Sequence, residues 1–136
     1  MISRRSILLT LAVVTLGQVS TLALAAPRKA ADPIKLLDTD NDGTIDLAEA
    51  KKAASDLVAK LDRDHEGTLD KRELARRLSA KELAAADTDH DGTLTADEYL
   101  AVVEQRFQAA DPDKDGKLEA KELNSPAGKA LLRLLK

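Results

Sequence analysis

The sequence predicts an all-α protein in which four short acidic loops alternate with helices. Two observations predict this fold class. A twelve-residue acidic pattern occurs four times, at 38–49, 62–73, 87–98 and 111–122. Between the copies, apolar residues recur at helical spacing, and Ser or Asp precedes several of the expected helices as a cap. We therefore expect one repeat-containing domain over residues 26–136.

Each copy of the pattern has a carboxylate at positions one, three and five, Gly at six, Ile or Leu at eight and Glu at twelve. The copies read DTDNDGTIDLAE, DRDHEGTLDKRE, DTDHDGTLTADE and DPDKDGKLEAKE. Of the 24 Asp and Glu residues, only Asp32, Asp56, Glu82 and Glu104 lie outside the loops. Four copies with Gly in register exclude a chance acidic surface.

Carboxylates at this spacing suit a calcium ion. Ca²⁺ takes six to eight oxygens at about 2.3–2.6 Å, and side chains at positions one, three and five of a tight loop point at one centre. Position seven supplies a backbone carbonyl, position nine usually acts through water, and Glu at twelve binds through both oxygens. The candidate ligands are Asp38, Asp40, Asp42, Thr44, Asp46, Glu49, Asp62, Asp64, Glu66, Thr68, Asp70, Glu73, Asp87, Asp89, Asp91, Thr93, Thr95, Glu98, Asp111, Asp113, Asp115, Lys117, Glu119 and Glu122.

These loops resemble the calcium loops of the EF-hand superfamily, and residues 26–136 resemble small exported bacterial calmodulin-like proteins with four such motifs. The resemblance implies a compact array of four helix-loop-helix motifs that binds up to four calcium ions. It also implies short β-bridges between paired loops, formed by the residues at position eight: Ile45, Leu69, Leu94 and Leu118.

The helices follow from cap signals and loop spacing. Asp32 and Pro33 begin a helix of about one turn before the first loop. The loops start only 24 or 25 residues apart, so one segment must leave one loop and enter the next. Residues 47–61 and 96–110 each predict a single helix. The apolar contacts expected are Leu57, Val58 and Leu61 in the first, and Tyr99, Leu100, Val103 and Phe107 in the second.

Two further segments carry cap signals. Ser79 to Glu82 has the form of a capping box, so we expect one short helix to end near Leu78 and another to begin at Ala80. Ser125 and Pro126 begin a last helix over about 126–135. Its favoured role is to complete a sparse core. The alternative is a tethered ligand in a groove that calcium opens.

The pairing of the loops stays open at this point. If the linking helices are unbroken, neighbouring loops sit at opposite helix ends, and loops one and three, and two and four, are the pairs. If the helices bend, consecutive loops pair.

The N-terminus predicts export. Arg4 and Arg5 precede the uncharged run Ile7 to Leu24, and Ala23 to Ala25 forms a cleavage site, so residues 1–25 are expected to be removed. We expect a periplasmic or secreted protein without a stable membrane anchor. The paired arginines leave the Sec and twin-arginine routes both open.

Composition excludes several function classes. The mature chain would carry a net charge of −5, because cleavage removes two Arg from the total of −3, and its Lys and Arg are scattered, so nucleic acid is not expected. There is no Cys, and no Ser/His/Asp or P-loop constellation, so we expect no enzyme. His65 and His90 lie at loop position four and are expected to face solvent, which argues against a zinc site.

Calcium buffering, or stabilisation by calcium, is therefore the leading functional interpretation. The alternative is a calcium-dependent sensor that recruits an unidentified protein partner or regulates an exported enzyme. Met1 is the single Met, so the Met-rich groove of a calmodulin-like sensor is missing. Glu66 is longer than the Asp usual at position five, so loop two is predicted to bind most weakly. We also expect the calcium-free chain to be loosely folded.

Overall fold

The computed structural model describes residues 32–136, so the predicted signal at 1–25 and the lead-in at 26–31 lie outside the described residues. About half of the described residues are helical. In chain order the elements are α1 (Pro33–Leu37), β1 (Ile45–Asp46), α2 (Leu47–Leu61), β2 (Thr68–Leu69), α3 (Ala80–Ala86), β3 (Leu94–Thr95), α4 (Ala96–Ala110), β4 (Lys117–Leu118), α5 (Ala120–Leu123) and α6 (Pro126–Leu132). Within this range no helix has both the length and the apolar character to cross a bilayer.

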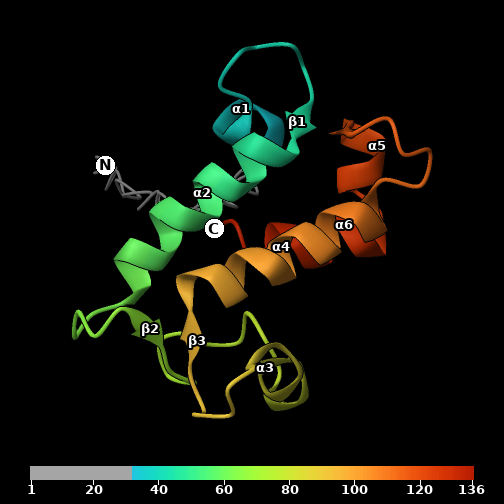
Figure 1. The fold of residues 1–136 in the computed structure, drawn as a ribbon. Coiled ribbons are helices and arrows are strands. Elements are labelled where there is room, and N and C mark those ends of the chain that lie inside the picture. Colours follow the sequence, from blue (N-terminus) through green and yellow to red (C-terminus); the bar gives the residue numbers. More distant parts are fainter. Residues whose placement is uncertain (1–31) are drawn as a thin grey trace, which may run out of the picture.

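Helices α2 and α4 form the centre of the fold and pack against each other (Figure 1). Their bounds confirm the two predicted single helices. Both begin with a capping box, in which Asp46 or Thr95 accepts from the backbone N–H three residues later. Each helix ends where the first Asp of the next loop begins. A linking helix therefore holds its two loops at opposite ends.

The core is built on one stripe of each central helix. On α4 it is Tyr99, Val103 and Phe107, as predicted, whereas Leu100 of the same predicted stripe is only half-buried. On α2 the buried apolar residues are Ala50, Ala54 and Val58, whereas Leu57 and Leu61 are only half-buried. The prediction for α2 was therefore only partly right. Alanines at a spacing of four lack bulk, which lets the backbone of α2 come close to α4.

The strand pairing matches neither arrangement left open by the sequence. β1 pairs antiparallel with β4, so Ile45 faces Leu118, and β2 pairs antiparallel with β3, so Leu69 faces Leu94. Loops one and four thus lie together at one end of the molecule and loops two and three at the other (Figure 1). The unbroken α2 and α4 separate the loops that they join. Only the segment between loops two and three can fold back.

That segment does not contain the helix expected to end near Leu78. Leu74 is followed by turns, and Ala75 and Arg76 have positive φ angles of 49° and 98°. Positive φ interrupts a right-handed helix, and the interruption reverses the chain so that β3 can lie beside β2. The second part of the prediction is confirmed, since Ser79 caps α3, which begins at Ala80.

The C-terminal segment packs along α4 and α5. α6 begins at Pro126 behind the Ser125 cap, as predicted, but it ends at Leu132 rather than near 135. Beyond that point the chain tightens into a turn, with the Leu134 N–H donating to the Leu131 carbonyl at 2.8 Å. Its buried leucines add to the core, in keeping with the favoured role: they are Leu131, Leu132, Leu134 and Leu135.

Helix–loop–helix units are complete around three loops of the described chain. Loop one lies between α1 and α2, loop three between α3 and α4, and loop four between α4 and α5. Loop two follows α2 but runs into the turns at 74–79. The expected array of four complete units is therefore three units and one loop that lacks an exit helix.

Candidate metal-binding loops

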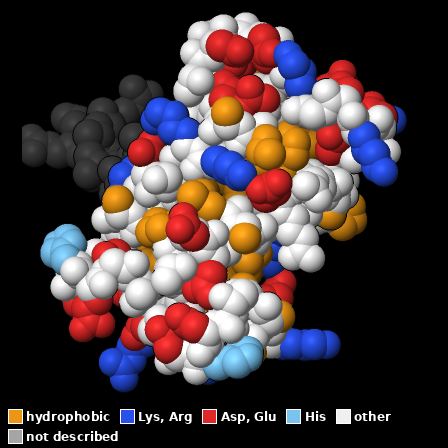
Figure 2. All heavy atoms as spheres, viewed as in Figure 1, with side chains coloured by type: hydrophobic (Ala, Val, Ile, Leu, Met, Phe, Trp, Pro, Cys, Tyr) orange, Lys and Arg blue, Asp and Glu red, His pale blue; other side chains and the backbone are white. Residues whose placement is uncertain are grey.

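Carboxylates from positions one, three and twelve converge in all four loops. In each loop one oxygen from each of the three side chains lies within 4.8 Å of the others. Two oxygens on opposite sides of a Ca²⁺ ion are about 4.6–5.2 Å apart, so this spacing suits calcium. The clusters are Asp38, Asp40 and Glu49; Asp62, Asp64 and Glu73; Asp87, Asp89 and Glu98; and Asp111, Asp113 and Glu122. Figure 2 shows acidic side chains gathered over loop one at the top and near the lower edge.

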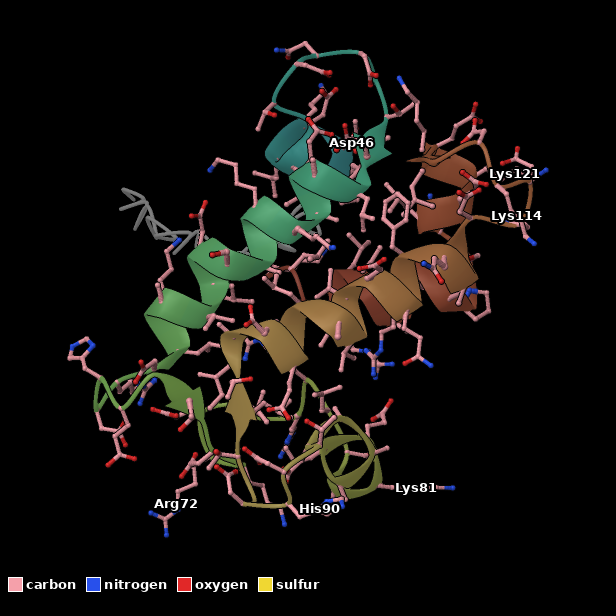
Figure 3. The ribbon with its side chains drawn as sticks, viewed as in Figure 1. Asp46, Arg72, Lys81, His90, Lys114 and Lys121 are labelled. Carbon is pink, nitrogen blue, oxygen red and sulfur yellow. The ribbon has the colours of Figure 1, made fainter. Side chains whose placement is uncertain are left out.

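The glycine at position six shapes each loop. Its φ lies between 82° and 90° in the four loops, a backbone conformation that glycine adopts at little cost. Its N–H donates to the Oδ2 atom of the Asp at position one, at 2.8–3.0 Å. The turn thereby orients the first carboxylate. The residue at position four also has positive φ in every loop, and His65 and His90 at this position are exposed, as predicted. In Figure 3, His90 lies at the lower edge of the molecule.

The Glu at position twelve is held from the other end of its own loop. Glu49 accepts from both the N–H and the hydroxyl of Thr39, at 2.5 and 2.9 Å. Thr88 donates to Glu98 in the same way, and the Arg63 N–H donates to Glu73. In loop four the equivalent residue is Pro112, which has no N–H to donate. Glu122 therefore cannot form the bond that steadies its counterparts.

Position nine has a structural role that the sequence analysis missed. Asp46, Asp70 and Thr95 each accept from the backbone N–H of the Glu at position twelve of the same loop, at 2.7, 2.8 and 3.3 Å. In return the Glu accepts from the N–H of position nine. Positions nine and twelve thus form a capping box, whose spacing is visible in the sequence. In these loops the residue at position nine orients the twelfth carboxylate.

Position five lies outside the three-carboxylate clusters. Asp42, Asp91 and Asp115 each accept from the N–H of position seven, at 2.8–2.9 Å. Among the described contacts, Glu66 has no such bond in loop two. Glu66 is one methylene longer than Asp, and its side chain is exposed.

A cross-loop ion pair joins loops one and four. The Lys117 ammonium at position seven of loop four donates to Oδ2 of Asp42 in loop one. The pairing of β1 with β4 brings the two side chains together. Position seven is Thr in the first three loops and Lys in loop four, so the sequence already marked Lys117 as an exception. Its partner could not be predicted without the strand pairing. Lys117 places a positive charge on an oxygen that calcium would use.

The carboxylates of loop one differ in acidity. The Lys117 ammonium, with the Thr44 hydroxyl and N–H, lowers the pKa of Asp42 to about 2. The pKa of Asp40 is raised: the Asp42 N–H acts to lower it, but desolvation and the charges of Asp42 and Glu49 together outweigh that bond. Crowded carboxylates without a cation repel each other in this way. A bound cation would relieve the repulsion.

Glu98 shows the effect of hydrogen bonding in loop three. The hydroxyl and N–H of Thr88, followed by the N–H of Thr95, lower the pKa of Glu98 to about 2. Asp89 is affected in the opposite sense, because its hydrogen bond with Asp87 raises its pKa. Glu98 is therefore held as a carboxylate, which is the form that binds a metal.

Loop two has a buried oxygen that calcium would satisfy. Oδ1 of Asp62 is buried and has no hydrogen-bond partner in the described structure. In the other three loops this atom accepts from the N–H of position four, at 2.6–2.7 Å. An unpaired buried carboxylate oxygen is costly unless it is ligated. Together with the carboxylate-rich donor sets, this atom shows that the loops fit a hard cation.

Comparison with known proteins agrees with this geometry. The family model described as EF hand matches residues 32–52, 80–103 and 102–125, and curated proteins gave no match. The matched segments contain loops one, three and four, the same loops that have helices on both sides. Loop two lies outside them. Family matches at three positions and acidic clusters in the loops support assignment of the chain to the EF-hand superfamily, which is typically a non-enzymatic calcium-binding fold.

Proposed function

We propose that this chain is an exported calcium-binding protein that takes up to four Ca²⁺ ions and acts as a buffer or a calcium-stabilised module. The observation that carries the proposal is the convergence of three carboxylates in each of four loops. Calcium would be held by these clusters, with the residue at position five and the carbonyl at position seven completing each shell. The raised pKa of Asp40 fits a loop that gains stability when a cation enters.

A closed apolar surface supports a buffer or stabilised module over a sensor. Among the described large hydrophobic residues, Leu36 is the exposed one, at 63%. The leucines of the C-terminal segment are buried, and the segment packs along α4 and α5. A calmodulin-like sensor would present an apolar groove when calcium binds. The interaction protein remains the second candidate, and calcium-induced exposure of apolar surface is its signature.

The test is a calcium titration of the chain from Ala26, followed by far-UV circular dichroism and binding of a hydrophobic dye. The buffer or stabilised module predicts rising helicity and falling dye binding. Little change in helicity with rising dye binding would favour the interaction protein. A variant with Gln at the twelfth position of all four loops is the matched control. If it takes up calcium as the parent does, the loops are not the sites.

Export is part of the same proposal and has a separate readout. Expression of the full chain in a bacterium, followed by fractionation and mass measurement, should give a periplasmic or secreted product that begins at Ala26. Replacing Arg4 and Arg5 by Lys distinguishes the two routes, since twin-arginine export depends on the pair. A full-length product in the cytoplasm would refute export.

A further inference from the structure

A basic groove lies between the turn after loop two and the C-terminal segment. Two of its lining residues, Ala75 and Arg77, also line the neighbouring cavity that contains Asp64 and Glu73 of loop two. The groove is shallow and broadly open to solvent, with a volume of about 700 Å³, and it is lined by Ala75, Arg76, Arg77, Leu132, Arg133 and Lys136. Four of these six residues have cationic side chains and none has an acidic side chain. They come from positions nearly sixty residues apart, so the scattered charges of the sequence are gathered here by the fold. The calcium sites make no use of this groove.

The groove has an apolar floor beneath its charges. Leu132 is 7% exposed and lines the groove together with the arginines. The aliphatic stems of Arg and Lys add apolar area while their charged heads stay in water. A ligand that fits would therefore carry negative groups at intervals and at least one apolar side chain. A free inorganic anion would leave the floor uncovered.

The backbone turn presents two consecutive arginines to the groove. Ala75 and Arg76 have φ angles of 49° and 98°, and φ of this kind is strained for a residue with a side chain. Arg76 is exposed, while Arg77 is half-buried. A regular helix after loop two would have turned these neighbouring side chains about a hundred degrees apart. The strained turn places both in the lining instead.

Arg77 is only partly satisfied by the protein itself. Its Nη2 donates to the backbone oxygen of Lys136 at 3.0 Å, which joins the two walls of the groove. Its Nε is buried and has no hydrogen-bond partner among the described residues. A guanidinium binds a carboxylate through two parallel N–H donors, but the buried Nε is not accessible to a ligand in the groove. Arg77 therefore joins the two walls and contributes its positive charge to the groove.

The shape of the groove favours a peptide over a membrane or a nucleic acid. A concave surface with a recessed leucine has no projecting apolar side chain to insert into a bilayer. Single-stranded nucleic acid binds by stacking on exposed aromatic rings, and the aromatic residues of this chain, Tyr99 and Phe107, are buried. A carboxylate-rich peptide matches both the charges and the floor.

We propose that this groove binds an acidic peptide segment of a partner protein, with Arg76, Arg77 and Arg133 receiving its carboxylates and Leu132 contacting an apolar side chain between them. The site does not depend on the calcium assignment, because none of its lining residues lies in a loop. Arg76 and Arg133 are exposed, so each can be changed with little risk to folding.

The test uses a fluorescein-labelled peptide of repeated Glu-Glu-Leu units and fluorescence anisotropy, in buffer with saturating calcium. The double variant Arg76→Glu/Arg133→Glu should weaken binding about tenfold or more, because two ion pairs become repulsive. The control Lys35→Glu/Lys81→Glu makes the same charge change at two exposed lysines outside both the groove and the four loops, and it should bind as the parent does. Circular dichroism and urea unfolding show that both variants are folded.

Several outcomes would overturn the proposal. Equal weakening by both double variants would reduce the effect to net charge. If a peptide with Gln in place of Glu binds the parent as tightly as the Glu peptide does, the carboxylates have no role in binding. Tighter, groove-dependent binding to anionic lipid vesicles or to a DNA oligonucleotide would assign another partner class. Sedimentation equilibrium tests a last outcome: if the parent self-associates and Arg76→Glu/Arg133→Glu does not, the occupant of the groove is a second copy of the chain.

Discussion

Gly128 allows α6 to lie against the end of loop four, and its replacement by Ala tests that packing. A Cβ atom at this position would be 2.1 Å from the backbone oxygen of Glu122 and 2.5 Å from Cα of Leu123. Both contacts are with backbone, which cannot rotate away as a side chain can. In an exposed helix, Gly→Ala stabilises by about 1 kcal/mol. Here the clash should reverse the sign and lower the free energy of unfolding by roughly 1–3 kcal/mol.

The same substitution should disturb calcium binding at one loop. Glu122 occupies position twelve of loop four, so a shift of its backbone moves the carboxylate that Pro112 already leaves unsupported. The four loop glycines serve as separate probes in a ¹⁵N-glycine NMR titration with calcium. The Gly116 resonance of loop four should need a higher calcium concentration to reach its bound position in Gly128→Ala than in the parent. The calcium concentration needed for the Gly43 resonance of loop one should change less.

Urea unfolding with and without calcium gives the stability change. Lys129→Ala is the matched control, because it alters the next, exposed residue of α6 and should change stability by less than about 0.5 kcal/mol. A Gly128→Ala variant that is as stable as the parent or more stable would refute the close approach of α6 to α5. Equal changes at Gly43 and Gly116 would refute its link to loop four.

Three further predictions follow from single contacts. Lys117→Thr should raise the calcium affinity of loop one up to about fivefold by freeing Asp42 from a surface ion pair. The control Lys114→Asn removes the same charge from loop four but does not touch that contact. An equal gain in the calcium affinity of loop one in Lys114→Asn would refute the role of the ion pair. Burial raises the pKa of Tyr99 to about 12, so its tyrosinate absorbance should appear near pH 12 in the folded chain and near pH 10 in urea. Because the unfolded state loses this proton first, stability should fall as pH rises from about 10 to 12; native ionisation near pH 10 would contradict the burial. Asp62→Ala should remove the weakest step of a calcium titration, and loss of the tightest step would reverse the ranking of the loops.

Local features of the fold could be predicted from the sequence because neighbouring residues set them. The loops follow from the spacing of their carboxylates and glycines, and α2 and α4 follow from the short interval between loops. The caps at Asp32, Ser79 and Ser125 bond to backbone only two or three residues away. Such contacts form within one turn of chain and need no partner from elsewhere. The candidate carboxylate clusters belong to this class.

Contacts between distant segments could not be predicted in this way. The Lys117–Asp42 ion pair requires β1 beside β4, and the basic groove requires Arg76 beside Arg133. Leu57 was expected in the core because it is large and apolar, yet Ala54 occupies the contact with α4. In a tightly packed pair of helices, the space available decides which residue is buried, and sequence periodicity does not report it.

By itself the sequence determined the four acidic loops, the two long helices and the capped starts of α1, α3 and α6, because each is a local arrangement within a few residues. Only the tertiary structure decided which loops pair, that loop two has no exit helix, and where the basic residues gather. The physical reason is that α2 and α4 are unbroken and hold their loops apart. The short segment between loops two and three must then make the reversal, and a strained turn at Ala75 and Arg76 takes the place of a helix.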